Sequence, residues 1–201
     1  FAWSARRRWR LMRVAARPEN RCDHVGARLG GLLSYVLGQA RMPRYPFAGV
    51  AHIVMFFGFL VLLLNSVLLW FRGYDATFTF WGVLDVHHPL GAAYAFLRDI
   101  FSVLVIVGVL AFFYNRAIVR LKRLTLNFEG LLILLIIFVM MIADLVYEAI
   151  EINSPSNNGR LVGAMPFASL TAAALHGLPD NVQTVLWHVG FWTHSALVLI
   201  F

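Results

Sequence analysis

Residues 46–71 form a run of 26 residues that contains no formally charged side chain. A helix needs roughly 20 apolar residues to cross the hydrocarbon core of a bilayer, so this run is long enough to span it. The overall composition agrees, because only 13% of the residues are charged, against about 25% in a typical soluble domain. The sequence therefore predicts an integral membrane protein.

Three further apolar stretches cover residues 91–115, 131–150 and 183–201. Each has about the length of a membrane-spanning helix. A shorter apolar stretch, residues 167–178, is expected to lie at the membrane interface. The predicted fold class is an all-α, polytopic transmembrane helix bundle with four full or nearly full spans.

The basic residues are distributed unevenly along the chain. Ten arginines precede residue 46 and four basic residues lie within 116–123, together 14 of the 17. The positive-inside rule places both segments on the cytoplasmic side. We therefore interpret residues 1–45 as a basic cytoplasmic connector, with an amphipathic helix over 24–41, and residues 46–201 as the transmembrane bundle. Since the net charge of +7 belongs to segments that flank the spans, we expect lipid contact and no nucleic-acid partner.

The cysteine content limits the redox centres that the chain can hold. Cys22 is the only cysteine, so these residues contain no Cys-x-x-Cys motif. Any iron–sulfur partner is therefore expected to lie outside them. The sequence begins at Phe1 without a methionine and stops inside an apolar run, so we expect it to be part of a longer chain.

Three histidines lie within the predicted spans: His52, His188 and His194. An ionisable residue inside a membrane is costly and is therefore a candidate functional residue. Imidazole is a usual axial ligand of haem iron, so histidines from two spans suggest a b-type haem. The helical rise predicts His194 near the middle of the membrane, His52 in the inner half and His188 near the outer edge. His52 and His194 could share one haem or serve two, and the alternative is that each hydrogen-bonds to a neighbouring helix.

Charged residues form a second candidate site. Arg98 and Asp144 lie at about the same predicted depth in neighbouring spans and carry opposite charges, so they are a plausible pair. Pairing of Arg98 with Asp99, Glu148 or a lipid headgroup is an equal alternative. Asp144, Glu148 and Glu151 share one helical face. The functional hypothesis is that Asp144 or Glu148, with Arg98, takes part in proton transfer linked to a membrane quinone.

Several segments resemble a known family. RYPFAGVAHIVMFFGFLVLLL, the Asp99-Ile100-Phe101 entry to the next span, and FWTHSALVLIF are similar to the cytochrome b (gamma) subunit of respiratory nitrate reductase. The likeness is closer to relatives in heterodisulfide-reductase-like proteins, in which a five-span membrane domain is fused to a cytoplasmic iron–sulfur domain. PENRCDHVGARLGGLLSYVLGQARMPRYPFAG resembles the connector of that fused group. Some members pass electrons between an electron-transfer flavoprotein and menaquinone.

The resemblance implies one or two b haems between the second and fifth spans of the family. It assigns His52 to the inner haem and His194 to the outer haem, and it places the fifth-span ligand of the inner haem beyond Phe201. Leu62 stands where the gamma subunit has a second histidine, so the outer haem lacks its expected partner. The implied setting is a multi-pass protein of a bacterial or archaeal cytoplasmic membrane.

Two functional classes follow from these observations. The first is a membrane cytochrome b, part of a quinone-linked oxidoreductase, that carries electrons between a quinone pool and an iron–sulfur or flavoprotein partner. The resemblance implies that the quinone is menaquinone. The second is a haem-free membrane anchor of a redox or transport complex. The absence of an internal repeat, and of a span broken at its centre, argues against transport. A reduced-minus-oxidised spectrum distinguishes the two classes.

Overall fold

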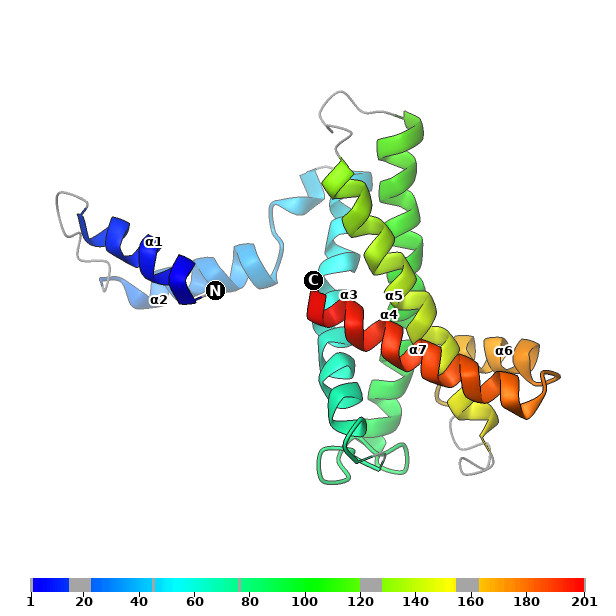
Figure 1. Cartoon of the computed structure of the whole chain (residues 1–201). Coiled ribbons are helices and arrows are strands. Elements are labelled where there is room, and N and C mark those ends of the chain that lie inside the picture. Colours follow the sequence, from blue (N-terminus) through cyan, green and yellow to red (C-terminus); the bar gives the residue numbers. More distant parts are fainter. Residues whose placement is uncertain are drawn as a thin grey trace. The chain divides into compact units, whose positions relative to one another are not determined.

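The computed structural model describes residues 2–14, 23–44, 46–75, 77–119, 128–154 and 163–200. The chain divides into two compact units, residues 1–41 and 42–201. In the part of the chain that is described, all regular structure is helical, which confirms the predicted all-α class (Figure 1).

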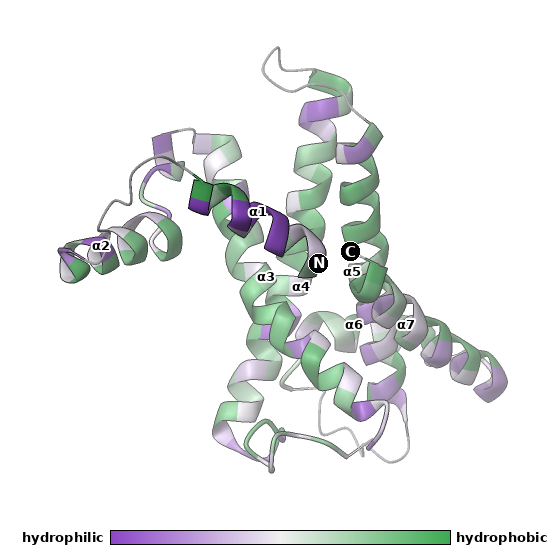
Figure 2. Cartoon of the chain, turned by 60° about the vertical axis from the view of Figure 1, so that its left-hand side comes forward, coloured by the Kyte–Doolittle hydropathy of each residue, from purple (hydrophilic) through white to green (hydrophobic). Residues whose placement is uncertain are grey.

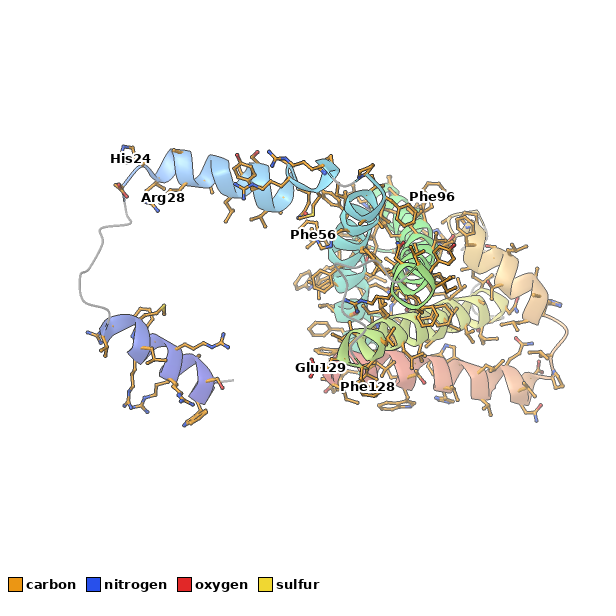
Figure 3. All side chains as sticks on the ribbon, turned by 90° about the horizontal axis from the view of Figure 1, so that it is seen from above. His24, Arg28, Phe56, Phe96, Phe128 and Glu129 are labelled. Carbon is orange, nitrogen blue, oxygen red and sulfur yellow. The ribbon has the colours of Figure 1, made fainter. Side chains whose placement is uncertain are left out.

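The first unit consists of exposed helices. Helix α1 (Ala2–Val14) carries most of the arginines of the described N-terminal region, and none of its residues is buried. Helix α2 (Val25–Leu32) continues into a π-helical turn, Leu33–Leu37, so the predicted helix over 24–41 forms over most of that range. At the start of α2 the Arg28 guanidinium binds the Asp23 carboxylate at 2.7 Å, close to His24 (Figure 3).

The second unit contains three helices that are long and apolar enough to cross a membrane. Helix α3 (Pro46–Arg72) and helix α5 (Phe128–Asn153) are uninterrupted, and helix α4 (Pro89–Tyr114) continues as a π-helical turn, Asn115–Val119. Figure 2 shows these helices mainly in hydrophobic colours. Proline opens α3 and α4, where its missing N–H costs no hydrogen bond. The chain is therefore a multi-pass membrane protein by the length and composition of these helices.

The expected fourth span differs from the other three. Residues 183–201 were expected to cross the membrane, and helix α7 (Asp180–Ile200) forms there. However, α7 is not among the described helices that are long and apolar enough to span, because its first half contains several polar residues. In Figure 1 and Figure 3 it runs obliquely to α3 and α4 and lies along α5. The number of full spans in the described residues is thus three.

Close helix contact depends on glycine at the α5–α7 crossing. A Cβ atom built on Gly190 of α7 would lie 2.8 Å from the Ala143 carbonyl oxygen and 3.0 Å from the Tyr147 Cβ, both on α5. Small residues allow helix backbones to approach in this way in membrane proteins. The glycine thus lets α7 lie against α5, one turn before His194.

Helix α6 (Pro166–Leu175) is short and closes one end of the bundle. The Asp99 carboxylate of α4 accepts hydrogen bonds from the backbone N–H groups of Phe167 (2.7 Å) and Ala168 (2.9 Å). A carboxylate at a helix N-terminus satisfies free N–H groups and favours the helix dipole. Ala168 and Ala172 then pack into an apolar cluster with α4 and α5. Asp99 therefore fixes α6 to the bundle, at what we call the α6 end.

The loop between α3 and α4 also lies at the α6 end, below the bundle in Figure 1. Hydrogen bonds from the Thr77 hydroxyl and backbone N–H lower the pKa of the exposed Asp75. His87 and His88 are both exposed, and the His88 Nδ1 accepts from the Leu90 N–H at the start of α4. The loop histidine at position 88 thus has a capping role.

Candidate functional site

A buried polar network joins α3, α4 and α5. The Arg98 Nη2 of α4 lies 2.8 Å from the Glu148 Oε1 of α5, and Arg98 Nη1 donates to the side-chain oxygen of Asn65 on α3. The Asn65 amide nitrogen donates in turn to both Asp144 oxygens, each at 3.1 Å. Arg98 therefore pairs directly with Glu148 and reaches Asp144 only through Asn65.

The network continues into α7. The Asp144 Oδ1 lies 3.4 Å from the His194 Nδ1, and the His194 Nε2 lies 3.0 Å from the Ser66 Oγ on α3. The first distance is longer than a normal hydrogen bond and indicates an electrostatic contact. A neutral His194 that turns Nδ1–H towards Asp144 presents its Nε2 lone pair to Ser66. His194 is thus a link between two helices rather than a side chain facing lipid.

Arg98 and Asp144 lie at equal depth, which allows Asn65 to join them. Arg98 lies nine residues after the start of α4, and Asp144 lies nine residues before the end of α5, which places both about 14 Å from the α6 end. Their side chains are nearly or completely inaccessible to solvent, with exposures of 7% for Arg98 and 0% for Asp144. Burying a charge in this way is tolerated where it is paired and hydrogen-bonded.

The structure separates the three histidines that the sequence singled out. His194 is 1% exposed, whereas His52 and His188 are both exposed. His52 precedes Ser66, the partner of His194, by 14 residues on α3, or about 21 Å along the helix. His52 and His194 therefore do not meet, and a single haem shared between them does not fit this arrangement.

An apolar cavity of about 270 Å³ lies between α3, α4, α5 and α7. Ser66 lies on its wall, as do residues at spacings of three and four along the same face of α3: Met55, Phe59 and Leu62. His52 lies on the same face, one turn before Met55. The cavity thus extends along one side of α3 from the level of Ser66 to that of Met55.

His194 has one feature of a haem ligand, a carboxylate behind one of its ring nitrogens. Ligating histidines usually donate their other ring N–H to a carboxylate or carbonyl, and the Asp144 carboxylate lies 3.4 Å from the His194 Nδ1. The Nε2 atom lies 3.0 Å from the Ser66 hydroxyl at the cavity wall, so a haem iron at Nε2 would have to replace that contact. Within the described residues no cluster of three or more His, Cys, Asp or Glu side chains could hold a bare metal ion. The donor set is therefore that of an imidazole ligand with a carboxylate behind it.

A polar pocket of about 650 Å³ opens at the α6 end, between the end of α5 and the start of α7. Glu151, His176, Gln183 and Trp187 contribute to its wall. The Trp187 indole N–H donates to the Glu151 Oε2 at 2.9 Å. Trp187 precedes His194 by seven residues on α7, or about 10 Å along the axis. The pocket thus combines hydrogen-bonding groups with aromatic surface close to the buried network.

Comparison with known proteins gives two relatives of similar sequence. The chain is 25% identical over 174 residues to the probable iron-sulfur-binding oxidoreductase FadF of Bacillus subtilis (strain 168), covering 87% of this chain and 24% of the relative. It is 26% identical over 194 residues to the EtfAB:quinone oxidoreductase of Syntrophomonas wolfei subsp. wolfei (strain DSM 2245B / Goettingen), covering 90% of this chain and 26% of the relative. The chain spans about a quarter of the length of the curated relatives it matches.

Other comparisons add no match. No protein-family model matches the sequence, and no solved structure matches it. The two relatives support a connection with oxidoreductases of iron–sulfur and quinone systems. They leave the finer resemblance to the nitrate reductase gamma subunit as an expectation.

Sequence reasoning missed several residues of the site. Asn65 and Ser66 interrupt the apolar run of α3 as an adjacent polar pair, a signal that was available but is weaker than a charge. Glu151 was placed on the face of Asp144 and Glu148, but Trp187, its hydrogen-bond partner, gave no signal of its own. Asp99 was noted only as an alternative partner for Arg98, whereas it binds the start of α6.

Proposed function

We propose that this chain is the membrane part of a quinone-linked oxidoreductase and carries electrons between a quinone and a redox partner. The observation that supports this most directly is the burial of His194 between Asp144 and Ser66, beside an apolar cavity. The relatives supply the setting, since one is named an iron-sulfur-binding oxidoreductase and the other an EtfAB:quinone oxidoreductase.

The proposed cofactor is haem b, in one or two copies. His194 would hold one haem and His52 a second, since about 21 Å of α3 separates their levels. When bound, a b-type haem supplies reversible one-electron transfer. Asp144, 3.4 Å from the His194 Nδ1, would orient the ring and favour its proton on Nδ1. The apolar side chains of the cavity exclude water from the Nε2 side.

The proposed substrate is a quinone, with menaquinone as the candidate that the family resemblance implies. The pocket at the α6 end offers the hydrogen-bonding groups that a quinone headgroup needs, with Glu151 and Trp187 on its wall. Arg98, Asp144 and Glu148 are buried behind this wall, so their proposed role is in proton transfer and electrostatics rather than headgroup contact.

The proposed partner is a cytoplasmic iron–sulfur domain or subunit, with an electron-transfer flavoprotein as a further candidate. The arginine-rich first unit carries no buried residue on α1, and the positive-inside rule assigns this segment to the cytoplasm. The proposed location is the cytoplasmic membrane of a bacterium or archaeon.

The test is a dithionite-reduced minus oxidised spectrum of the full-length protein and of three variants. His194→Ala should remove the haem whose ligand it supplies, and His52→Ala should remove a different fraction of the absorbance. His188→Ala is the control, since the proposed assignment gives His188 no haem to hold, and it should keep the full spectrum. Absence of haem absorbance in the wild-type protein would favour a haem-free membrane anchor, and full absorbance in both His52→Ala and His194→Ala would refute the ligand assignment.

A further inference from the structure

A second, smaller cavity lies inside the bundle behind the polar pocket. Its volume is about 50 Å³, and it lies between α3, α4 and α5 under the loop that precedes α4. Its wall contains six titratable side chains from these three helices: Arg72, Tyr94, Arg98, Tyr147, Glu148 and Glu151. So many polar groups around one cavity distinguish it from the apolar cavity near Ser66.

The polar atoms at this cavity need more partners than the protein supplies. Within the described part of the chain, the Arg98 Nε has no hydrogen-bond partner, and both Glu148 oxygens have none beyond the ion pair with Arg98. Buried polar groups in proteins are nearly always hydrogen-bonded to protein or to ordered water. A polar cavity needs only about 10–15 Å³ of such volume to hold a water, so this cavity has room for at least one.

Glu151 connects this cavity with the outside. Its side chain lies on the wall of both the polar pocket and the inner cavity. It is half-buried and held by the Trp187 indole at 2.9 Å. One helical turn earlier on α5, Glu148 lies on the same face as Glu151 and faces the same cavity. A carboxylate at the surface and a carboxylate in the interior thus share one polar space.

We propose that this cavity is a water-filled proton route between the α6-end pocket and Glu148. The inference rests on the proposed function for its substrate, a quinol in that pocket. When the quinol is oxidised, its two electrons pass to the redox centre of the oxidoreductase and both of its hydroxyl O–H bonds break. One proton forms a new O–H bond on the Glu151 carboxylate, and the other forms a new O–H bond on water in the α6-end pocket. Water in the cavity carries a proton on to Glu148, which holds it beside Arg98. Quinone reduction runs the same steps in reverse.

The first experiment tests the water without any need for haem or quinone. Hydroxyl radicals generated in the wild-type, full-length protein oxidise side chains that lie beside interior water. Met165 and Met141 are matched probes because both are buried, with 0% and 1% of their surface exposed. They differ in their surroundings, since Met165 lines the small inner cavity and Met141 lines the apolar cavity near Ser66. We expect Met165 to be oxidised and Met141 to be protected. Equal protection of both would overturn the proposal.

The second experiment tests the proton route by quinol oxidation. Glu151→Gln keeps the shape and the hydrogen-bonding oxygen of the side chain but cannot carry a proton, and should slow turnover by on the order of tenfold or more. Glu129→Gln, an exposed carboxylate near the opposite end of α5, should leave turnover unchanged. Reduction of haem by dithionite needs no proton from quinol and should be equal in all forms.

The outcomes separate this inference from the proposed function. Normal turnover in Glu151→Gln, in a protein that contains haem and oxidises quinol, would overturn the proton route alone. A wild-type protein without haem and without quinol oxidation would refute the proposed function. In that case, the oxidation of Met165 relative to Met141 still decides whether the cavity holds water.

Discussion

Replacement of Asp99 by alanine should release helix α6 from the bundle. The carboxylate is 0% exposed and accepts two backbone N–H bonds, at 2.7 and 2.9 Å. Each buried donor that loses its partner costs about 1–3 kcal/mol, and a helix cap alone is worth about 1 kcal/mol. Loss of the partner of the buried Ala168 N–H should cost about 1–3 kcal/mol, and the partly buried Phe167 N–H should add about 1 kcal/mol, so we expect a total loss of about 2–4 kcal/mol.

The assay is the labelling of a cysteine placed at Ala172, which is 2% exposed and faces the cluster between α6, α4 and α5. The cysteine reacts only when α6 opens, which breaks both hydrogen bonds. A loss of about 2–4 kcal/mol in the free energy of opening therefore raises the open fraction, and with it the labelling rate, by about 30- to 900-fold. Asp180→Ala is the control, since this exposed carboxylate lies in the first turn of α7 and is worth about 0.3–1 kcal/mol. An unchanged labelling rate in Asp99→Ala would refute the anchoring of α6 by Asp99.

Two further predictions concern helix packing and topology. Gly190→Leu should force α7 away from α5, because even a Cβ atom would lie 2.8 Å from the Ala143 carbonyl oxygen. We expect thermal unfolding to show a loss of at least about 1–3 kcal/mol in the free energy of unfolding. Gly177→Leu is the control and should be neutral, because a Cβ atom there meets nothing within 4 Å. Cysteines placed at Arg116 and His176, in a protein with Cys22 changed to Ser, should label from the cytoplasmic and the opposite side respectively; ready labelling at position 116 from outside intact cells would show that the orientation is wrong.

The helices could be predicted from the sequence because their signal is local. A long apolar run without charge, such as residues 46–71, predicts a membrane-spanning helix. Helix α3 begins at the predicted residue and ends one residue after the predicted end. The basic segment over 116–123 lies partly outside the described residues, since Arg120, Lys122 and Arg123 belong to the range that is not described. Its cytoplasmic side stays a prediction.

The candidate site could be predicted only in part, because depth follows from sequence but rotation about the helix axis does not. Arg98 and Asp144 are predicted at one level of the membrane, and both lie there. However, Asp144 and Glu148 are one turn apart on α5, and only the packing of the helices decides that Glu148 contacts the guanidinium directly while Asp144 binds Asn65. Similarly, His52 and His194 looked equivalent as histidines in apolar stretches. His194 is buried because α7 lies against α3 and α5, whereas no described helix covers His52.

Helix α4 also constrains the order in which the protein can be assembled in the membrane. It carries adjacent charges of opposite sign, Arg98 and Asp99, yet their main partners are made later in the chain: Glu148 is 50 residues further on, and the start of α6 is nearly 70. When α4 leaves the ribosome, only Asn65 of α3 is available to Arg98. A charge at the centre of a helix costs about 2.5–3.5 kcal/mol on insertion, so α4 is expected to stay at the insertion machinery until α5 arrives. Biogenesis would then proceed by the joint release of α3, α4 and α5 into lipid rather than helix by helix.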